Sequence, residues 1–211
     1  MKISILGAGN VGGALGRAWA KRGHQITFGV PRPNDPKVQS LVAALGTAAS
    51  ARDVAGAAAA GEVVVLATPW LATQEAIRLA GAHLNGKLVI DCTNPLKPDL
   101  SGLTVGLDDS GGEQVARWAR GASVFKAMNQ TGADNMAECS FPGGKPVMLV
   151  CGDDEARKPV VVGLVAELGF EALDAGGLAA ARMLEPYALL WIHLAIARKL
   201  GTRFAFQLAR R

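Results

Sequence analysis

A glycine motif near the amino terminus restricts the possible folds more than any other feature of this sequence. Residues 2–6 form a short apolar run, and residues 7–12 directly after it read Gly-Ala-Gly-Asn-Val-Gly. Apolar residues then recur at spacings of three and four from Val11 to Trp19, which predicts an amphipathic helix. Residues 25–28 read as a second strand. A strand, a glycine turn, a helix and a strand in this order form the unit that binds dinucleotides in Rossmann folds.

Each glycine of this motif has a separate physical role. Gly7 would allow a tight turn, Gly9 would let a pyrophosphate approach the backbone, and Gly12 would let the helix pack closely on the sheet. The N–H groups at the start of the helix, near Asn10 and Val11, would attract a phosphate. A chance match is the alternative, because the chain holds 26 glycines in 211 residues. The strand before the motif and the helix after it favour nucleotide binding.

The composition describes a globular protein and argues against several classes of function. The chain is 50% hydrophobic and 19% charged, and its net charge of +4 comes without a basic stripe, so nucleic acid is not an expected partner. Three cysteines without CxxC spacing predict free thiols, no metal site and a cytoplasmic location. The longest apolar run near the C-terminus, residues 187–197, is too short to span a bilayer. Met1 leads straight into a strand, so we expect no signal peptide.

The remaining pattern predicts an α/β fold. Further strands are expected at residues 46–49, 62–67, 87–91, 123–127, 146–151 and 170–174. Helices are expected at residues 37–45, 70–84, 113–120, 154–168 and 178–200, and in the alanine-rich stretch after residue 53. The run at 62–67 is apolar on both faces, as buried parallel strands are. We therefore predict a Rossmann-like, doubly wound, mostly parallel sheet in residues 1–176 and a C-terminal helical extension in residues 177–211.

Three local signals add detail to this prediction. Residues 50–53 resemble a capping box that would open the alanine-rich helix. Pro186 would kink or restart the last helix. The stretch Thr93–Gly112 lacks periodicity and holds two prolines and four glycines. A loop of this length at the carboxyl end of a strand favours a role in ligand binding over a plain surface connection.

Several segments together resemble one family of enzymes. They are residues 5–12, 67–69, 91–96, 124–129 and 174–178, with Glu185-Pro186. The most specific are Asp-Cys-Thr-Asn-Pro-Leu at 91–96 and Lys-Ala-Met-Asn at 126–129. In these segments the chain resembles the F420-dependent NADP oxidoreductases, and the reductase domain of the STEAP metalloreductases is similar. The resemblance covers nearly the whole chain. It implies NADP(H) as cofactor and hydride transfer to or from a deazaflavin.

The resemblance also implies particular site residues. In that family the loop after the fourth strand and the Asn-Pro turn after the fifth line the cofactor, which here are Thr68, Pro69, Asn94 and Pro95. The polar residue after the sixth strand lies near the nicotinamide and the acceptor ring, and here it is Asn129. Asn94 could equally be a turn former before proline, and Asn129 a helix N-cap. We expect the acceptor between Asn94, Asn129 and the loop 103–112.

The histidines and lysines supply no evident proton donor. An alcohol dehydrogenase needs a general base, usually His or Lys, at its site. His24 and His83 lie away from the predicted site, and His193 lies in an apolar helix as an expected core or interface residue. Lys97 and Lys126 have no obvious partner. Hydride transfer between stacked rings needs proximity and no protein acid. We therefore expect no catalytic side chain and a planar acceptor, F420 or a flavin.

The end of the second predicted strand favours NADP over NAD. NAD enzymes usually carry an acid there that binds the ribose hydroxyls, and this chain has Gly29 instead. Arg32 is the first charged residue after the strand, and its guanidinium could hold a 2′-phosphate with two parallel hydrogen bonds. The alternatives are that Arg32 is a solvated loop residue, or that Asp35 binds the ribose.

The sequence also allows two other functions, and it predicts a homodimer. One is an imine or β-hydroxy-acid reductase, although such relatives generally add a large helical domain and only about 35 residues follow Gly176. The other is a non-enzymatic NADP(H) sensor, which a blocked acceptor cleft would favour. The helix Tyr187–Ala197 is apolar nearly all round and is predicted to be buried, so we expect a homodimer that uses it.

Overall fold

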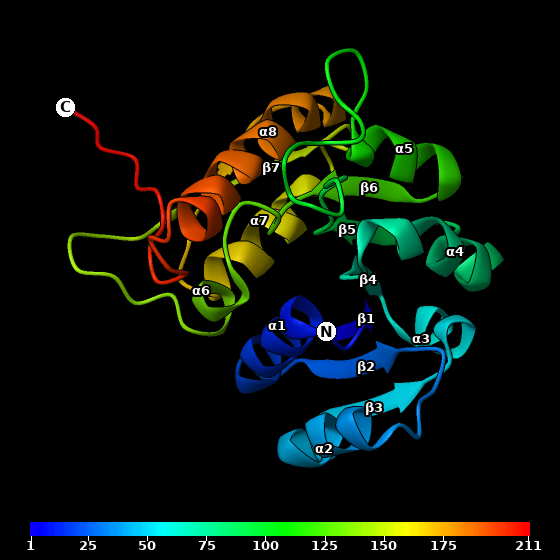
Figure 1. Cartoon of the computed structure of the whole chain (residues 1–211). Helices are drawn as coiled ribbons and strands as arrows, with labels where there is room; N and C mark the ends of the chain where they lie inside the picture. Colours follow the sequence, from blue (N-terminus) through cyan, green and yellow to red (C-terminus); the bar gives the residue numbers. More distant parts are fainter.

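The computed structural model describes all 211 residues and contains one eight-stranded sheet (Figure 1). The strands are β1 (Lys2–Leu6), β2 (Gln25–Gly29), β3 (Ala49–Arg52), β4 (Val63–Leu66), β5 (Leu88–Asp91), β6 (Ser123–Lys126), β7 (Val147–Gly152) and β8 (Glu171–Asp174). Their spatial order is β3-β2-β1-β4-β5-β6-β7-β8. Strands β1 to β6 are parallel, β7 is antiparallel to β6, and β8 is parallel to β7. The predicted Rossmann-like fold is confirmed.

Helices cover both faces of the sheet (Figure 1). They are α1 (Asn10–Lys21), α2 (Pro36–Leu45), α3 (Val54–Ala60), α4 (Trp70–Ala80), α5 (Gly111–Trp118), α6 (Ala133–Ala137), α7 (Lys158–Glu167) and α8 (Ala181–Ile192). Short 3-10 turns lie at Gly46–Ala48, Gly81–Leu84 and Leu178–Ala180, and a π turn at His193–Ala197 extends α8. Helices α1, α6 and α7 pack on one face, and α3, α4 and α5 pack on the other. No helix combines the length and the apolar character that crossing a membrane requires.

Strand β4 shows how the sequence builds two cores. All four of its residues are buried. Because side chains alternate along a strand, Val63 and Val65 join the core under α1 and α7, while Val64 and Leu66 join the core under α3 and α4. On the first face, the Trp19 indole N–H donates to the Leu164 carbonyl at 3.0 Å and ties α1 to α7. This two-sided burial is what the apolar run predicted.

The chain order reverses between β1 and β4, which are neighbours in the sheet. The loops that leave these two strands run to opposite faces, so a crevice opens at their carboxyl ends. The glycine turn follows β1 at this crevice, and the loops after β4, β5 and β6 border the same edge. The fold therefore gathers the predicted site segments at one edge of the sheet.

The structure corrects two predictions around the third strand. Residues 46–48 form a 3-10 turn, and the strand begins only at Ala49. Ser50 is not a helix cap, because β3 pairs with β2 through it; Asp53 caps α3 instead and accepts from Gly56 N at 2.7 Å. The error arises because tertiary strand pairing outweighs a local capping signal.

Two helix predictions also need correction, and one helix was not foreseen. The helix expected from residue 154 begins at Lys158, after turns that follow β7. Helix α6 was not predicted, because its five residues are too few to show a helical period. Helix α8 continues through the exposed Pro186, so the chain does not restart a helix there.

Helix α8 is buried on one side only. Leu184, Ala188 and Trp191 face the protein. On the other side apolar side chains are exposed, among them Met183, Leu190, Ile196 and Leu200. Met183 and Leu190 belong to α8, Ile196 to the π turn that extends it, and Leu200 to the segment after that turn. We call these four residues the outer face of α8. In the tail, Phe204 stacks on Trp191 with ring centroids 5.1 Å apart, and the Phe206 carbonyl accepts from Val147 N at 2.9 Å. The tail thus follows the end of β7 without forming a regular strand.

Candidate active site

The glycine turn after β1 has the geometry that a dinucleotide needs. Gly7 has a φ of +113°, and a Cβ there would lie 2.5 Å from the Ala67 carbonyl oxygen, so only glycine fits. At Gly12 a Cβ would collide with the Gly7 carbonyl oxygen, which explains the close approach of α1 to the turn. Gly9 differs, because a Cβ there would meet no atom within 4 Å. The space next to Gly9 is open and accessible to a ligand.

The start of α1 is free to bind an anion. Gly9 is the N-cap, with no side-chain cap hydrogen bond, and the first turn carries no acidic residue. Gly13 N already donates to Gly9 O at 2.8 Å, so the free N–H groups are those of Asn10, Val11 and Gly12. Asn10 is exposed and Val11 is half-buried. The N-terminal end of the helix dipole adds partial positive charge at this place.

The turn after β4 lies next to the glycine turn. Ala67 contacts the Gly7 position, and Thr68 and Pro69 follow it into α4. The Thr68 hydroxyl is 2.9 Å from the Thr73 hydroxyl, which also donates to the Pro69 carbonyl at 3.1 Å. These bonds fix a half-buried Thr68 and an exposed Pro69 at the crevice. The turn that carries both predicted residues therefore begins beside the glycine turn at Gly7.

Asn94 and Asn129 form a pair across the loops after β5 and β6. The Asn94 amide donates to the Asn129 carbonyl at 2.8 Å, and the Asn129 amide donates to Asn94 Oδ1 at 2.9 Å. Gln130 Nε2 donates to Asn129 Oδ1 at 2.9 Å. Asn129 is buried and Asn94 is half-buried, so Asn94 has the more accessible side chain. Pro95 is buried, and its carbonyl accepts from Thr104 N at 2.7 Å. The pair sets the position of Asn94, and contact of Asn129 with a substrate stays a prediction.

The carboxyl end of β2 is basic. Arg32 is exposed and forms no ion pair within the chain. Asp35 caps α2, because its carboxylate accepts from Lys37 N at 3.0 Å, and this weakens the alternative that it binds a ribose. Arg52 is a second basic residue at this edge, and the sequence analysis did not identify it. It ends β3 opposite Gly29 and is also exposed. Its position at the end of a strand was a usable signal, since neighbouring parallel strands end at the same edge of the sheet.

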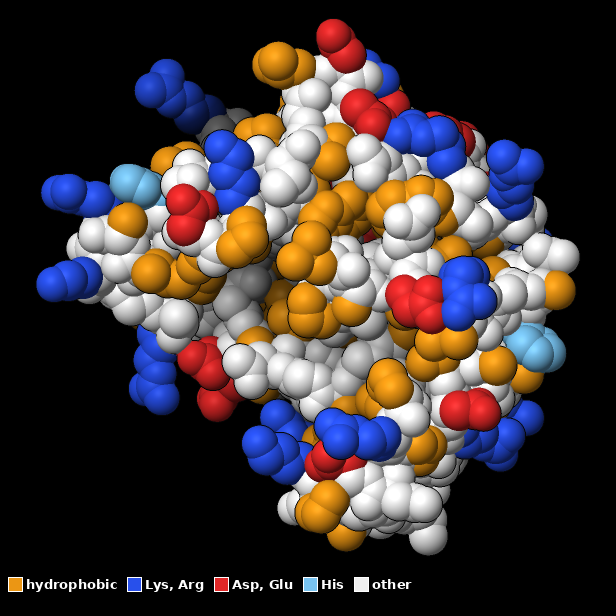
Figure 2. Space-filling model, turned by 45° about the vertical axis from the view of Figure 1, so that its right-hand side comes forward, with side chains coloured by type: hydrophobic (Ala, Val, Ile, Leu, Met, Phe, Trp, Pro, Cys, Tyr) orange, Lys and Arg blue, Asp and Glu red, His pale blue; other side chains and the backbone are white.

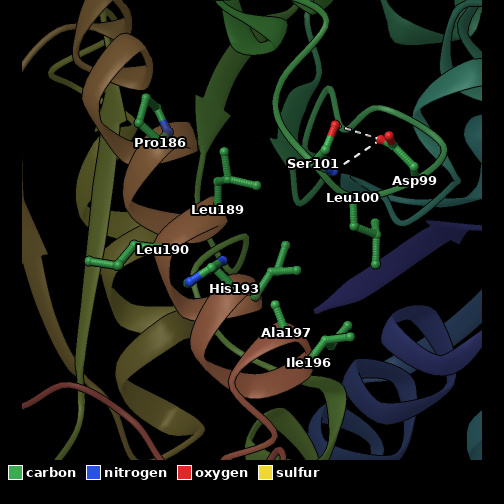
Figure 3. Close-up of a pocket in the computed structure, with 10 residues that line it drawn as sticks. Asp99, Leu100, Ser101, Pro186, Leu189, Leu190, His193, Ile196 and Ala197 are labelled. Carbon is green, nitrogen blue, oxygen red and sulfur yellow. Dashed lines mark hydrogen bonds between the residues drawn. The ribbon is translucent and has the colours of Figure 1, made fainter.

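A groove of about 580 Å³ lies between α8 and the loop after β5. Leu100 points from the loop toward Ile196 in the π turn that extends α8, and Leu189 lines the groove from the helix (Figure 3). His193 lines the groove and is exposed, so it is not a core residue of this chain, and its place in an interface stays a prediction. Hydrophobic side chains also border the hollow in the middle of the face in Figure 2. A planar ring system suits an apolar groove of this kind.

A buried charged cluster was not foreseen. Lys126 Nζ lies 2.7 Å from Asp91 Oδ2 and 2.8 Å from Glu185 Oε1, so the expectation that Lys126 has no partner is wrong. Asp91 and Lys126 are paired in register at the ends of β5 and β6. Both end apolar runs in the sequence, which was a signal that they lie side by side. Glu185 could not be linked to them without the tertiary structure.

The remaining histidines lie away from this edge, as predicted. His24 precedes β2 at the opposite end of the strand, and its Nε2 is 2.7 Å from Glu167 Oε2 at the end of α7. His83 is exposed in the 3-10 turn before β5. Neither can reach a nicotinamide bound at the crevice.

Comparison with known proteins identifies relatives. Residues 2–95 match the family model for coenzyme F420-dependent NADP oxidoreductases. The F420-dependent NADP reductase of Methanothermobacter thermautotrophicus is 30% identical over 94% of this chain and 91% of its own length. A candidate F420-dependent NADP reductase from Arthrobacter sp. fb24 is 33% identical, with a TM-score of 0.90 over 100% of both chains.

A more distant match is the rat metalloreductase STEAP3, 27% identical over 89% of this chain but only 36% of its own length. Full-length similarity at 30% identity or more, in sequence and in fold, is found with the F420-dependent NADP reductases. The glycine turn and the open space at Gly9 lie within the matched residues 2–95. The chain belongs to the family of coenzyme F420-dependent NADP oxidoreductases.

Proposed function

We propose that the chain transfers hydride between NADP(H) and a planar electron carrier, with coenzyme F420 as the first candidate and a flavin as the second. Family membership makes the chain an oxidoreductase with NADP(H) as its cofactor. In the direction of carrier reduction, NADPH gives a hydride to the carrier ring and becomes NADP⁺, while water supplies the proton that completes the reduced carrier. The two rings need stacking and proximity from the protein.

The observation that carries this proposal is the chemistry of the crevice. Its polar side chains are hydroxyls and amides, namely Thr68, Asn94 and Asn129. The charged groups at the ends of β5 and β6 belong to the buried cluster and are paired with one another. These crevice side chains can bind and orient rings, and none of the three is an acid or base for a carbonyl or imine substrate.

The proposed arrangement assigns the cofactor to the edge of the sheet. The pyrophosphate would lie on Gly7, Gly9 and the N–H groups of α1, and the 2′-phosphate on Arg32. The nicotinamide would then lie between the turn at Thr68-Pro69 and the turn at Asn94-Pro95. The carrier would stack on it from the side of Asn129, with the apolar groove along α8 available to the rest of the molecule. Residues 1–176 would hold the cofactor, and residues 177–211 would complete the carrier site.

The direct test is NADPH oxidation with F420, FMN, FAD and a ferric chelate in parallel. The proposal expects the highest kcat/KM with F420 or a flavin. Oxidation with none of the four carriers would favour the sensor, and activity with the ferric chelate alone would refute a planar carrier.

One observation keeps the imine reductase alternative worth testing. His193 lines the groove on α8 and is exposed, so its ring could protonate a substrate there. His193→Ala should leave hydride transfer to F420 or a flavin unchanged within about threefold. Reduction of cyclic imines by the wild type that is lost in this variant would support the alternative.

We also propose a homodimer through the outer face of α8. Four apolar side chains exposed along one helix and the residues that directly follow it are typical of a surface that another molecule covers. A second copy of the chain is the occupant that the sequence analysis expects, and on this face it would also border the groove, because Leu190 and Ile196 belong to both.

A further inference from the structure

The buried cluster of Lys126, Asp91 and Glu185 calls for an explanation beyond stability. The side chains are 0%, 0% and 1% exposed. Taking three charges out of water is costly, and well-packed apolar residues in place of such a cluster are often as stable or more so. A buried ion cluster is therefore better explained by what its geometry fixes. Here it joins the ends of β5 and β6 to α8.

The cluster is electrically balanced by a helix end. It holds two carboxylates and one ammonium. Glu185 Oε2 accepts from Gly111 N at 2.9 Å, and Glu185 Oε1 accepts from Gly112 N at 2.9 Å. These are the first two residues of α5, where the helix dipole carries partial positive charge. Burial alone would lower the pKa of Lys126, but its attraction to Asp91 and Glu185 outweighs this and raises the pKa, so the lysine stays charged.

One cluster holds both ends of the loop between β5 and α5. At the first end, Asp91 Oδ1 accepts from Thr93 N at 2.9 Å and from Thr93 Oγ1 at 2.7 Å, while Lys126 Nζ donates to the Thr93 carbonyl at 2.8 Å. Thr93 directly precedes Asn94. At the second end, Glu185 holds Gly111 and Gly112, where the loop enters α5.

The backbone packs so closely against the cluster that the cluster fixes the position of the neighbouring loops. A Cβ at Gly111 would lie 3.0 Å from Glu185 Oε1, and a Cβ at Gly112 would lie 3.3 Å from Lys126 Cε. Both are tighter than ordinary contacts, so glycine lets the backbone reach the charges. Lys126 also leads into Met128, which adopts a φ of +60°, and then into Asn129. The turn after β6 is thereby fixed relative to the same cluster.

We propose that Lys126, Asp91 and Glu185 are positioning residues for hydride transfer. They do not touch either ring; they hold the Asn94 turn, the Asn129 turn and the loop 93–112 at the separation that lets the two rings react. This inference rests on the proposed function. A displacement of about 1 Å from a change outside the reacting groups can cost on the order of a hundredfold in rate.

The test compares Lys126→Met with a matched control, Lys158→Met. Lys158 is also buried and pairs with two carboxylates, Glu155 at 2.6 Å and Asp174 at 3.0 Å. It lies at the opposite edge of the sheet, where its neighbour Arg157 donates to the Gly86 carbonyl at 2.8 Å. Both variants lose an ammonium and keep an unbranched side chain, so both should lower the melting temperature.

The two variants should separate in kinetics. Lys126→Met should keep the NADPH Kd within about threefold and lose on the order of a hundredfold in kcat for carrier reduction. Lys158→Met should keep kcat within about twofold. Equal kcat losses in the two variants, or an unchanged kcat in Lys126→Met, would overturn the inference.

Glu185→Gln guards against a Lys126 variant that does not fold. The substitution keeps the volume of the side chain, but the amide NH₂ of glutamine cannot accept from a backbone N–H. One of the two hydrogen bonds from Gly111 and Gly112 is therefore lost. We expect an intermediate loss of kcat and faster amide hydrogen exchange at both glycines and at Thr93. Native kcat and exchange rates in this variant would refute the inference.

The proposed function and the positioning role of the cluster are refuted by different results. If none of the tested carriers supports NADPH oxidation by the wild-type protein, the proposed function is refuted. Hydrogen exchange of the NADPH-bound protein then still tests whether the cluster holds residues 93–112, with Lys158→Met as control. If the wild type is active and all variants match it, only the inference about positioning fails.

Discussion

Gly9→Leu separates cofactor binding from folding, because the structure shows open space where the new side chain would project. A Cβ at Gly9 meets no atom within 4 Å, and the residue is exposed. The folded state therefore loses only the preference for glycine over leucine at a helix N-cap, about 1 kcal/mol. For a chain of this size that corresponds to about 2–4 °C in melting temperature.

The loss in binding should be much larger than the loss in stability. The leucine would fill the space over the free N–H groups of α1, where the pyrophosphate is expected. Two charge-assisted hydrogen bonds at roughly 1.5–3 kcal/mol each amount to about 3–6 kcal/mol. Since every 1.4 kcal/mol is tenfold, the NADPH Kd should rise by about a hundredfold or more. Isothermal titration measures the Kd, and thermal unfolding measures the stability.

Two further glycines serve as controls for this experiment. Gly163 on α7 is also exposed with no atom within 4 Å of a Cβ, so Gly163→Leu should bind NADPH normally and be as stable as the wild type or more so. Gly12→Ala should lose stability and binding together, because its Cβ would collide with the Gly7 carbonyl oxygen. A folded Gly9→Leu protein that binds NADPH within about threefold of the wild type would refute the reasoning.

Three other changes test the remaining assignments. Arg32→Ala should weaken NADPH binding about ten- to a hundredfold and leave NADH binding nearly unchanged, as one lost charge-assisted contact predicts; equal loss of both would exclude Arg32 as the phosphate ligand. Asn129→Leu should lower kcat/KM for the carrier more than it weakens NADPH binding, and equal effects in steady-state kinetics and titration would contradict the assignment. Leu190→Asp should convert a dimer to a monomer in light scattering, because it places a charge on the outer face of α8; a wild-type monomer at micromolar concentration would end this idea.

The part of the site built from neighbouring residues could be predicted from the sequence. From Lys2 to Gly29 the signals are local: an apolar run, glycines at fixed spacing, and a helical period. No competing pairing overrides them, so the strand, turn, helix and strand appear where expected. The prediction failed at Ser50, where a capping signal competed with the pairing of β3 to β2.

The contacts between distant segments could not be predicted. Asp91, Lys126 and Glu185 are far apart in the sequence, and their meeting depends on strand register and on how α8 returns to the sheet. Likewise, the hydrogen bonds of Asn129 to Asn94 and Gln130 were not foreseen, and its contact with a ligand stays a prediction. A polar residue at a strand end does not reveal whether it will contact a ligand or another loop.

The reversed direction of β7 gives this protein a labelling site that lies away from the cofactor crevice. Because β7 runs against β6, the turn from Asp153 to Arg157 lies at the edge opposite the glycine turn. Ala156 is exposed there, whereas Cys92 and Cys151 are buried and Cys139 is half-buried. Burial raises the pKa of Cys139 to about 11 and that of Cys151 to about 12, which keeps these thiols protonated and slow to alkylate. A single cysteine introduced at Ala156 would therefore accept a dye or a surface tether selectively, with the cofactor crevice facing away from the attachment.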